Sequence, residues 1–168
     1  MSAIRGVAAA TVLDNDLPGG QVRVTLADSD HQLDCRVLQP YAGPDFGTFL
    51  IPEKGVEVLV AFYHGDDRLP VVLGCLWNGQ DKPPAERGGG KDPKLIKTQG
   101  GHRILLDDSD GAKKIEIVDA DGANRIVIDT AGRSITIETG GKLALRGREI
   151  EIEAQGPLKL KGLTIDLN

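Results

Sequence analysis

The sequence predicts an all-β protein made of two unlike parts. In the first half, apolar and polar residues alternate at every second position, and clusters of Gly, Pro, Asp and Asn interrupt the alternation. In the second half, short Ile-x-Ile or Leu-x-Leu segments recur with a glycine between most of them. Alternation of period two is the pattern of a strand with one buried face. All six aromatic residues lie between residues 41 and 77, so the second half lacks the side chains that usually anchor a globular core.

Residues 1–78 form the first predicted part. Five alternating or apolar runs in this part fit strands: residues 1–13, 22–26, 33–37, 56–62 and 71–73. About five strands over this length suit a small barrel or a sandwich, and the five-stranded OB barrel is one such form. Cys35 lies in one of these apolar runs and Cys75 lies beside another, and we interpret both as small buried hydrophobes.

The N-terminal run of residues 1–13 is interpreted as a strand rather than a secretory signal. Its apolar stretch is short, is broken by Thr11 and meets Asp14 without a convincing cleavage site. No apolar stretch approaches the roughly 18 residues of a membrane-spanning helix. We therefore expect synthesis in the cytoplasm without a signal peptide.

Residues 79–94 are rich in Pro, Gly and charge and are predicted to be a linker. Residues 95–168 then repeat a short strand and a turn. The expected strands are residues 104–106, 115–117, 126–128, 135–137, 143–145, 150–152, 158–160 and 163–167. Short periods of this kind are typical of a β-solenoid or a β-prism.

The free energy gained by burying the aliphatic side chains, compared with the entropy cost of ordering the backbone, favours several chains over one for this repeat. Burying a Leu or Ile contributes about 1.5–3 kcal/mol, whereas ordering each residue costs about 1–2 kcal/mol of backbone entropy. One chain with two aliphatic side chains per strand is therefore marginal. Three chains wound about an axis would turn these side chains inward and remove open strand edges. We therefore predict an intertwined homotrimer, with the following core residues: Ile115, Ile117, Ile126, Ile128, Ile135, Ile137, Leu143, Leu145, Ile150, Ile152, Leu158 and Leu160.

Four stretches of the first part, residues 20–26, 35–43, 46–62 and 64–79, resemble a known domain. They are similar to the OB-fold spike domain of phage baseplate assembly protein V, the phage cell-puncturing tail lysozyme and the type VI secretion valine-glycine-repeat spike proteins. The most specific string runs from Pro52 to Phe62, with His64-Gly65-Asp66 and Pro70-Val71-Val72-Leu73-Gly74 after it. The Gly-punctuated tail resembles the triangular β-helix of the same family. The resemblance implies an OB-fold barrel followed by an intertwined trimeric triangular β-helix, a β-prism.

Three departures from the family shape the expected role. The chain has no muramidase domain, and it has no large N-terminal hub domain, so a separate baseplate hub protein would mount the barrel. It also has no His-x-His motif near the C-terminus, where family members with their own apex bind iron. The resemblance therefore implies a blunt end that binds a separate PAAR-type tip protein. We assign that end to Leu163, Ile165, Leu167 and Asn168.

The resemblance implies a structural central spike of a phage tail or related contractile injection apparatus, which punctures the target cell envelope mechanically. We expect the protein to be incorporated into a phage tail or a secreted, extracellular injection particle. No motif supplies a catalytic constellation, a metal site or a cofactor site, so an enzyme is the weakest hypothesis. Trp77 is expected in the barrel core rather than in a contact with the hub.

Two alternative functions remain open. The first is an OB-fold protein that binds nucleic acid or saccharide and carries a trimerising β-stalk. A net charge of −5 argues against binding a polyanion, whose affinity comes mainly from Lys and Arg. The second is a cell-surface trimeric fibre or adhesin, which the missing signal segment disfavours.

Overall fold

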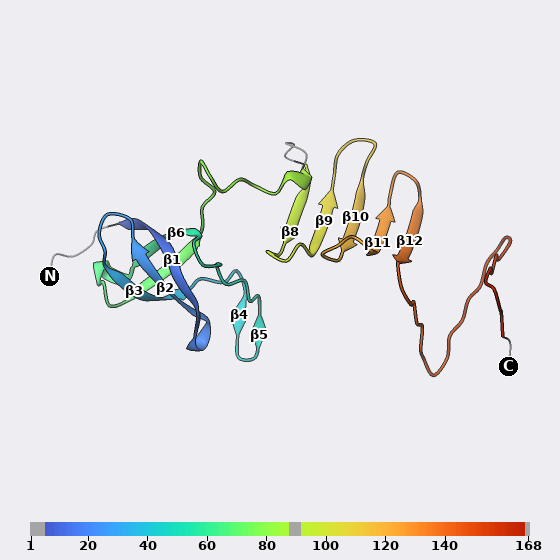
Figure 1. The fold of residues 1–168 in the computed structure, drawn as a ribbon, viewed down its shortest axis with the longest axis horizontal. Coiled ribbons are helices and arrows are strands. Elements are labelled where there is room, and N and C mark those ends of the chain that lie inside the picture. The colour runs from blue at the N-terminus through green and yellow to red at the C-terminus, as the bar shows by residue number, and fades with distance from the viewer. Residues whose placement is uncertain (1–5, 88–91, 167–168) are drawn as a thin grey trace. The chain divides into compact units, whose positions relative to one another are not determined.

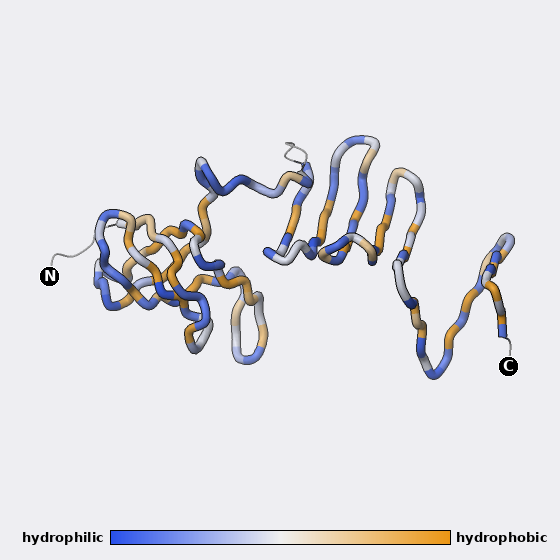
Figure 2. Tube along the Cα trace, in the orientation of Figure 1, coloured by the Kyte–Doolittle hydropathy of each residue, from blue (hydrophilic) through white to orange (hydrophobic). Residues whose placement is uncertain are grey.

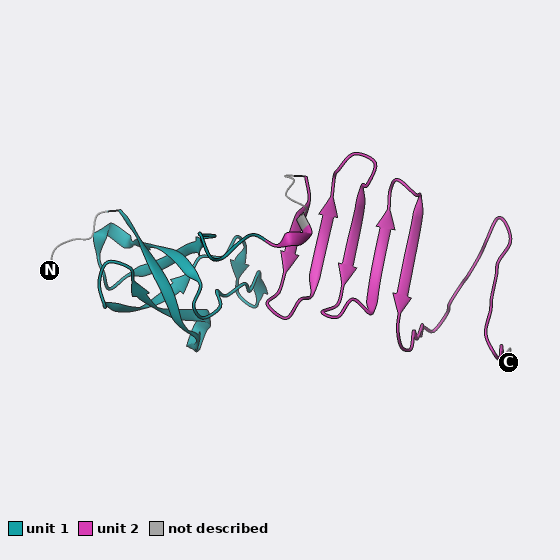
Figure 3. Ribbon diagram, turned by 45° about the horizontal axis from the view of Figure 1, so that its top comes forward, with its two compact units in different colours: residues 1–83 teal, residues 84–168 magenta. Residues whose placement is uncertain are grey.

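The computed structural model describes residues 6–87 and 92–166, and the chain divides into two compact units, residues 1–83 and 84–168 (Figure 3). Both units are built from strands. The helices within the described ranges are single 3-10 turns: η1 (Pro18–Gly20), η2 (Tyr63–Gly65) and η3 (Ala85–Arg87). Within those ranges, no helix has the length and apolar character needed to cross a membrane.

The first unit is a closed five-stranded barrel in the order β1-β2-β3-β7-β6 (Figure 1). Its strands are β1 (Val7–Leu17), β2 (Gln21–Leu26), β3 (Gln32–Val37), β6 (Glu57–Phe62) and β7 (Pro70–Cys75). The long strand β1 pairs with both β2 and β6, and two register shifts bend it between those neighbours. A short parallel pairing of Arg36 with Val71 and of Val37 with Val72 closes the barrel. Of the two forms open to the sequence, the barrel is confirmed.

The barrel core consists mainly of valines contributed by alternate positions of the strands. Figure 2 shows apolar and polar residues alternating along these strands. The buried cluster is Ala10, Val12, Val22, Val24, Leu26, Cys35, Val58, Val60, Phe62 and Val72. Valine is stiff and β-branched, so it suits a narrow, pleated interior. The period-two pattern therefore predicted which residues would be buried.

The prediction for Trp77 is wrong. Phe62 is the one aromatic residue of the six in the barrel core, whereas Trp77 is 69% exposed. Strand β3 ends opposite Val72, so the remainder of β7 has only β6 beside it. Trp77 follows this half-paired stretch, where the barrel interior has already ended.

The two cysteines differ in burial because the barrel interior ends partway along β7. Cys35 is completely buried, and burial, assisted by the neighbouring Asp34 carboxylate, raises the pKa of its thiol to about 12. Cys75 is the last residue of β7 and is exposed, so its interpretation as a buried hydrophobe is wrong. Cys35 is confirmed in that role.

The second unit contains a five-stranded antiparallel sheet in the order β12-β11-β10-β9-β8 (Figure 1). Its strands are β8 (Lys94–Lys97), β9 (Arg103–Asp107), β10 (Lys114–Val118), β11 (Asn124–Asp129) and β12 (Ser134–Thr139). The last four contain the first four predicted repeats. Strand β8 was not predicted, because its Leu95-Ile96 pair lacks the Ile-x-Ile spacing and directly follows the polar linker. Gly111 and Gly122 adopt a positive φ of 77° in the turns between strands.

Residues 140–166 form no strand within one chain, although they contain most of the last four predicted repeats. A strand requires a hydrogen-bonded neighbour, and here none is supplied by the described residues of the same chain. The triangular β-helix is therefore not visible in a single chain.

Candidate functional site

One face of the β8–β12 sheet carries nine large aliphatic side chains in two rows. We call this surface the apolar face. Cross-strand register places the first row at Ile96, Ile104, Ile117, Ile126 and Ile137. It places the second row at Leu106, Ile115, Ile128 and Ile135. Each of the nine side chains is at least 40% exposed.

This face is aligned because the turn lengths keep the strands in register. In each ladder an Ile or Leu lies directly opposite another, and directly opposed side chains are the closest pairs in a sheet. Shifting one strand by a single residue would turn its aliphatic pair to the opposite face. The repeated Ile-x-Ile spacing therefore specifies one continuous apolar surface.

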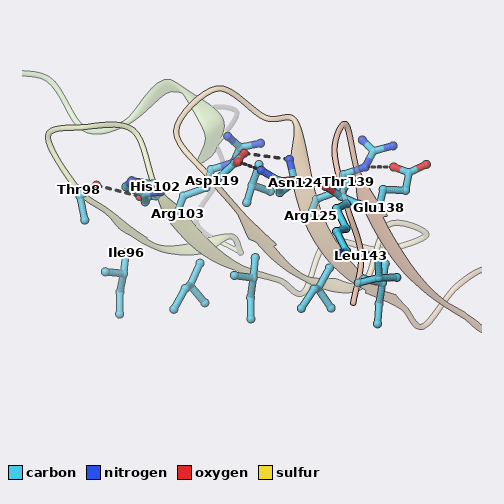
Figure 4. A pocket seen from close by; sticks show the side chains of 16 residues that line it. Ile96, Thr98, His102, Arg103, Asp119, Asn124, Arg125, Glu138, Thr139 and Leu143 are labelled. Atoms are coloured by element: carbon cyan, nitrogen blue, oxygen red, sulfur yellow. Dashed lines mark hydrogen bonds and ion pairs between the residues drawn. The ribbon is translucent and has the colours of Figure 1, made fainter. Parts of the chain in front are cut away.

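A hollow of about 610 Å³ follows the first row (Figure 4). Ile96 lies in the apolar part of this hollow, and Leu143 contributes from beyond β12. The opposite rim is polar, and Figure 4 shows Thr98 and His102 on it. An open apolar groove with an ordered polar rim is a surface suited to binding another protein segment.

Hydrogen bonds fix the polar rim. The Thr139 hydroxyl donates to Asn124 Oδ1 at 2.6 Å. The backbone N–H of Asn124 donates to Asp119 Oδ1 at 3.1 Å, and its side-chain amide also donates to the Asp119 carboxylate. These bonds, led by the backbone one, lower the pKa of Asp119. The rim therefore holds an ionised carboxylate beside an apolar floor.

The opposite face of the sheet exposes mainly polar residues, and its aliphatic residues Leu105 and Val118 are buried. Glu116 accepts ion pairs from Lys114 Nζ at 3.0 Å and Arg103 Nη2 at 3.8 Å. Arg125 pairs with Glu138 on the same face. The sheet is thus amphipathic, and the side that exposes its aliphatic residues is the side expected to find a partner.

The structure brings six of the twelve predicted trimer-core residues together on the apolar face: Ile115, Ile117, Ile126, Ile128, Ile135 and Ile137. The other six lie in residues 140–166 and are 53–65% exposed: Leu143, Leu145, Ile150, Ile152, Leu158 and Leu160. The predicted trimer core did not include Ile96, Ile104 and Leu106, although residues 104–106 were predicted as a strand. The Ile-x-Leu spacing of the last two was visible in the sequence, whereas Ile96 is revealed only by its pairing with Ile104.

The predicted cap-binding end is partly described. Leu163 is fully exposed and Ile165 is 51% exposed. Leu167 and Asn168 lie outside the described residues.

Within the described residues of the barrel unit, the arginines contact other residues of the same unit. Arg23 donates two hydrogen bonds to Asp34, at 2.6 and 2.9 Å. Arg36 stacks over the Tyr63 ring at 5.5 Å. Arg68 hydrogen-bonds to Asp66 and lowers the pKa of that carboxyl to about 2. Nucleic-acid binding would require such cations to face phosphate instead.

Two known domains match this chain. Residues 8–77 match the type VI secretion system/phage-baseplate injector OB domain. Residues 93–167 match the phage baseplate V C-terminal trimerisation domain. The two matches correspond to the barrel and to the sheet with its C-terminal extension.

Similar curated proteins are type VI secretion spike proteins. The chain is 36% identical over 75 residues to the type VI secretion system spike protein VgrG5 of Pseudomonas aeruginosa, covering 44% of this chain and 10% of the relative. It is 33% identical over 86 residues to VgrG4b of the same organism, covering 47% of this chain and 11% of the relative. It is 31% identical over 75 residues to the actin cross-linking toxin VgrG1 of Vibrio cholerae, covering 44% of this chain and 7% of the relative. The chain thus spans about a tenth of the length of these relatives.

Proposed function

Because the chain belongs to the phage baseplate V family and carries both its injector OB domain and its trimerisation domain, we propose that it is the central spike of a contractile injection apparatus. Three copies form the spike and act as a structural device rather than as a catalyst. The observation that carries this proposal is the apolar face, which a single chain leaves open. It lies within the residues that match the trimerisation domain.

In this proposal, three apolar faces meet around a common axis. Completing the burial of a half-exposed Ile or Leu contributes about 1 kcal/mol, and each chain offers nine such side chains on the face. The polar face, with its Glu116 and Glu138 ion pairs, remains outside. This arrangement is one part of the proposed triangular β-helix.

Residues 140–166 form the remaining part of the proposed β-helix. Their exposed aliphatic pairs, such as Leu143 with Leu145 and Ile150 with Ile152, have the spacing of strands with one buried face. Strands contributed by neighbouring copies would pair with them and bury them. All edges along the shaft would then be closed, which gives a narrow structure that resists buckling under a compressive load.

The proposed partners follow from this arrangement. A baseplate hub protein holds the barrels, and a PAAR-type tip protein covers the blunt end at Leu163 and Ile165. Contraction of the apparatus then drives the spike through the target membrane. The assembled particle is carried by a phage or secreted from the producing cell.

Light scattering on the purified chain tests the proposal. We expect a mass of about 54 kDa, three times the 17.9 kDa of one chain, because the apolar face cannot remain open in water. A monodisperse 17.9 kDa species with hydrogen-exchange protection in β9–β12 would contradict the proposal.

Removal of residues 150–168 tests the cap assignment. We expect the shortened chain to lose capture of a purified PAAR-type tip protein in a pull-down assay, while the barrel strands keep their protection against hydrogen exchange. The point variant Leu163→Asp should also lose capture, because it places a charge where the cap would bury an apolar side chain. Lys161→Gln, two residues away, is the matched control and should keep it. Capture of the tip protein by the Leu163→Asp trimer would show that the cap binds elsewhere.

A further inference from the structure

A hairpin on the barrel unit displays a second apolar surface that the trimer core does not use. Strands β4 (Ala42–Gly43) and β5 (Phe46–Gly47) form this hairpin, which leaves the barrel between β3 and β6 (Figure 1). Five large apolar side chains on and beside it are 53–78% exposed: Leu38, Tyr41, Phe46, Phe49 and Leu50. We call these five residues the hairpin patch.

The base of the hairpin is held by a side chain. Gln39 Nε2 donates to the carbonyl of Leu50 at 3.2 Å, and its Oε1 accepts from the Leu50 N–H at 3.3 Å. The same Oε1 accepts from the Thr48 hydroxyl at 3.1 Å. The Thr48 N–H donates to the carbonyl of Tyr41 at 2.8 Å. The two arms are therefore fixed beyond the short ladder itself.

Two glycines allow close packing within the hairpin, one against the Phe46 ring and one against the backbone of Tyr41. A Cβ on Gly43 would lie 2.1 Å from the Phe46 ring, so this ring is seated directly on the glycine. Gly47 has a φ of 142°, and a Cβ there would meet the Tyr41 carbonyl at 2.4 Å. The Tyr41 and Phe46 rings lie 5.2 Å apart. These rings are held in place although they fill no core, and rigid exposed aromatics bind partners at a low cost in conformational entropy.

We propose that the hairpin patch packs against the barrel of a neighbouring copy of this chain, so that the three barrels form a closed ring. The proposal rests on the trimeric spike proposed above. The five side chains expose on the order of 500 Å², which is below the roughly 800 Å² per partner of a stable free complex. Chains that are already joined through their shafts need less area, because the second contact forms at a millimolar effective concentration. The size of the patch therefore favours a tethered copy over a freely diffusing protein.

A ring of three copies requires two different surfaces on each barrel, since its contacts are heterologous. The barrel offers a second apolar group at the end of β7 and just after it: Leu73, Leu76 and Trp77, all 39–69% exposed. This group explains why Trp77 is exposed in a single chain. It is the surface that the neighbouring hairpin patch would cover.

Photo-cross-linking of the full chain tests the contact. Benzoylphenylalanine replaces Phe49, the most exposed residue of the patch, and the same probe replaces exposed Asp30 in the matched control. With no other protein present, illumination should convert the Phe49 variant to a species of twice the 17.9 kDa chain mass. Peptide mapping should place the cross-link in residues 73–77 of the second copy. The Asp30 variant should remain uncross-linked.

Light scattering on each variant separates the two proposals. A trimer of about 54 kDa, three times the chain mass, without a chain-to-chain cross-link from position 49 would overturn the hairpin contact and leave the spike proposal standing. A cross-link from position 49 to residues 92–166 would have the same consequence. Capture of a hub protein that depends on Phe49, without any chain-to-chain cross-link, would overturn it too. A monomeric protein would overturn both proposals together.

Discussion

Replacing Ile137 by aspartate is expected to dissociate the trimer into single chains. Ile137 lies in the first row of the apolar face, directly opposite Ile126. In one chain it is 53% exposed, so a charge there costs a monomer little. In the trimer each substituted chain would bury an unpaired carboxylate, at a cost of several kcal/mol for each. Light scattering should therefore show a fall from three chain masses to one.

The adjacent residue supplies the control for this prediction. Thr136 is exposed on the opposite face of the same strand, paired with Val127. Thr136→Asp introduces the same charge into β12 and should leave the mass unchanged. Equal dissociation by both substitutions would indicate that β12 tolerates no charge, rather than that one face is buried between chains. A trimeric Ile137→Asp protein would remove this residue from the proposed core.

Replacing Phe62 by alanine is expected to destabilise the barrel without changing the oligomeric state. Phe62 is 7% exposed and belongs to the buried cluster. Truncating a buried phenylalanine typically costs about 3–5 kcal/mol, from lost burial and from the cavity left behind. Hydrogen exchange in β2 and β6 should accelerate by roughly two to three and a half orders of magnitude. Exchange in β9–β12 should change little, because those strands belong to the other compact unit.

Leu13→Ala provides the comparison for the barrel. Leu13 is 42% exposed on β1, beside the buried Val12. Shortening it should alter barrel exchange by less than about tenfold, since surface substitutions usually change stability by about 0.5 kcal/mol or less. If the Phe62→Ala protein lost its trimer mass, the shaft would depend on the barrel for assembly, contrary to this expectation.

Local sequence patterns predicted most of the strands that have a partner strand in the same chain. The alternation around Val22 and Val58 and the Ile-x-Ile repeats at Ile115 and Ile126 each correspond to an observed strand. The same pattern at Leu143 and beyond yields no strand in one chain, because pairing depends on a neighbour and not on the segment alone. Strand β8 was not predicted because its own sequence pattern is weak, and only its pairing with β9 makes it a strand.

The all-β class, the family, the valine-rich core positions and the aliphatic pairs at Ile115, Ile126 and Ile135 could all be predicted from the amino-acid sequence. These depend on periodicity and composition, which act over a few residues. Three features became visible only in the folded chain: nine aliphatic residues share one open face, Trp77 and Cys75 lie outside the barrel core, and an aromatic hairpin held by Gln39 lies outside that core too. Those features depend on where distant strands end relative to one another. The register of β3 against β7 sets the end of the barrel through long-range pairing, which no local pattern records.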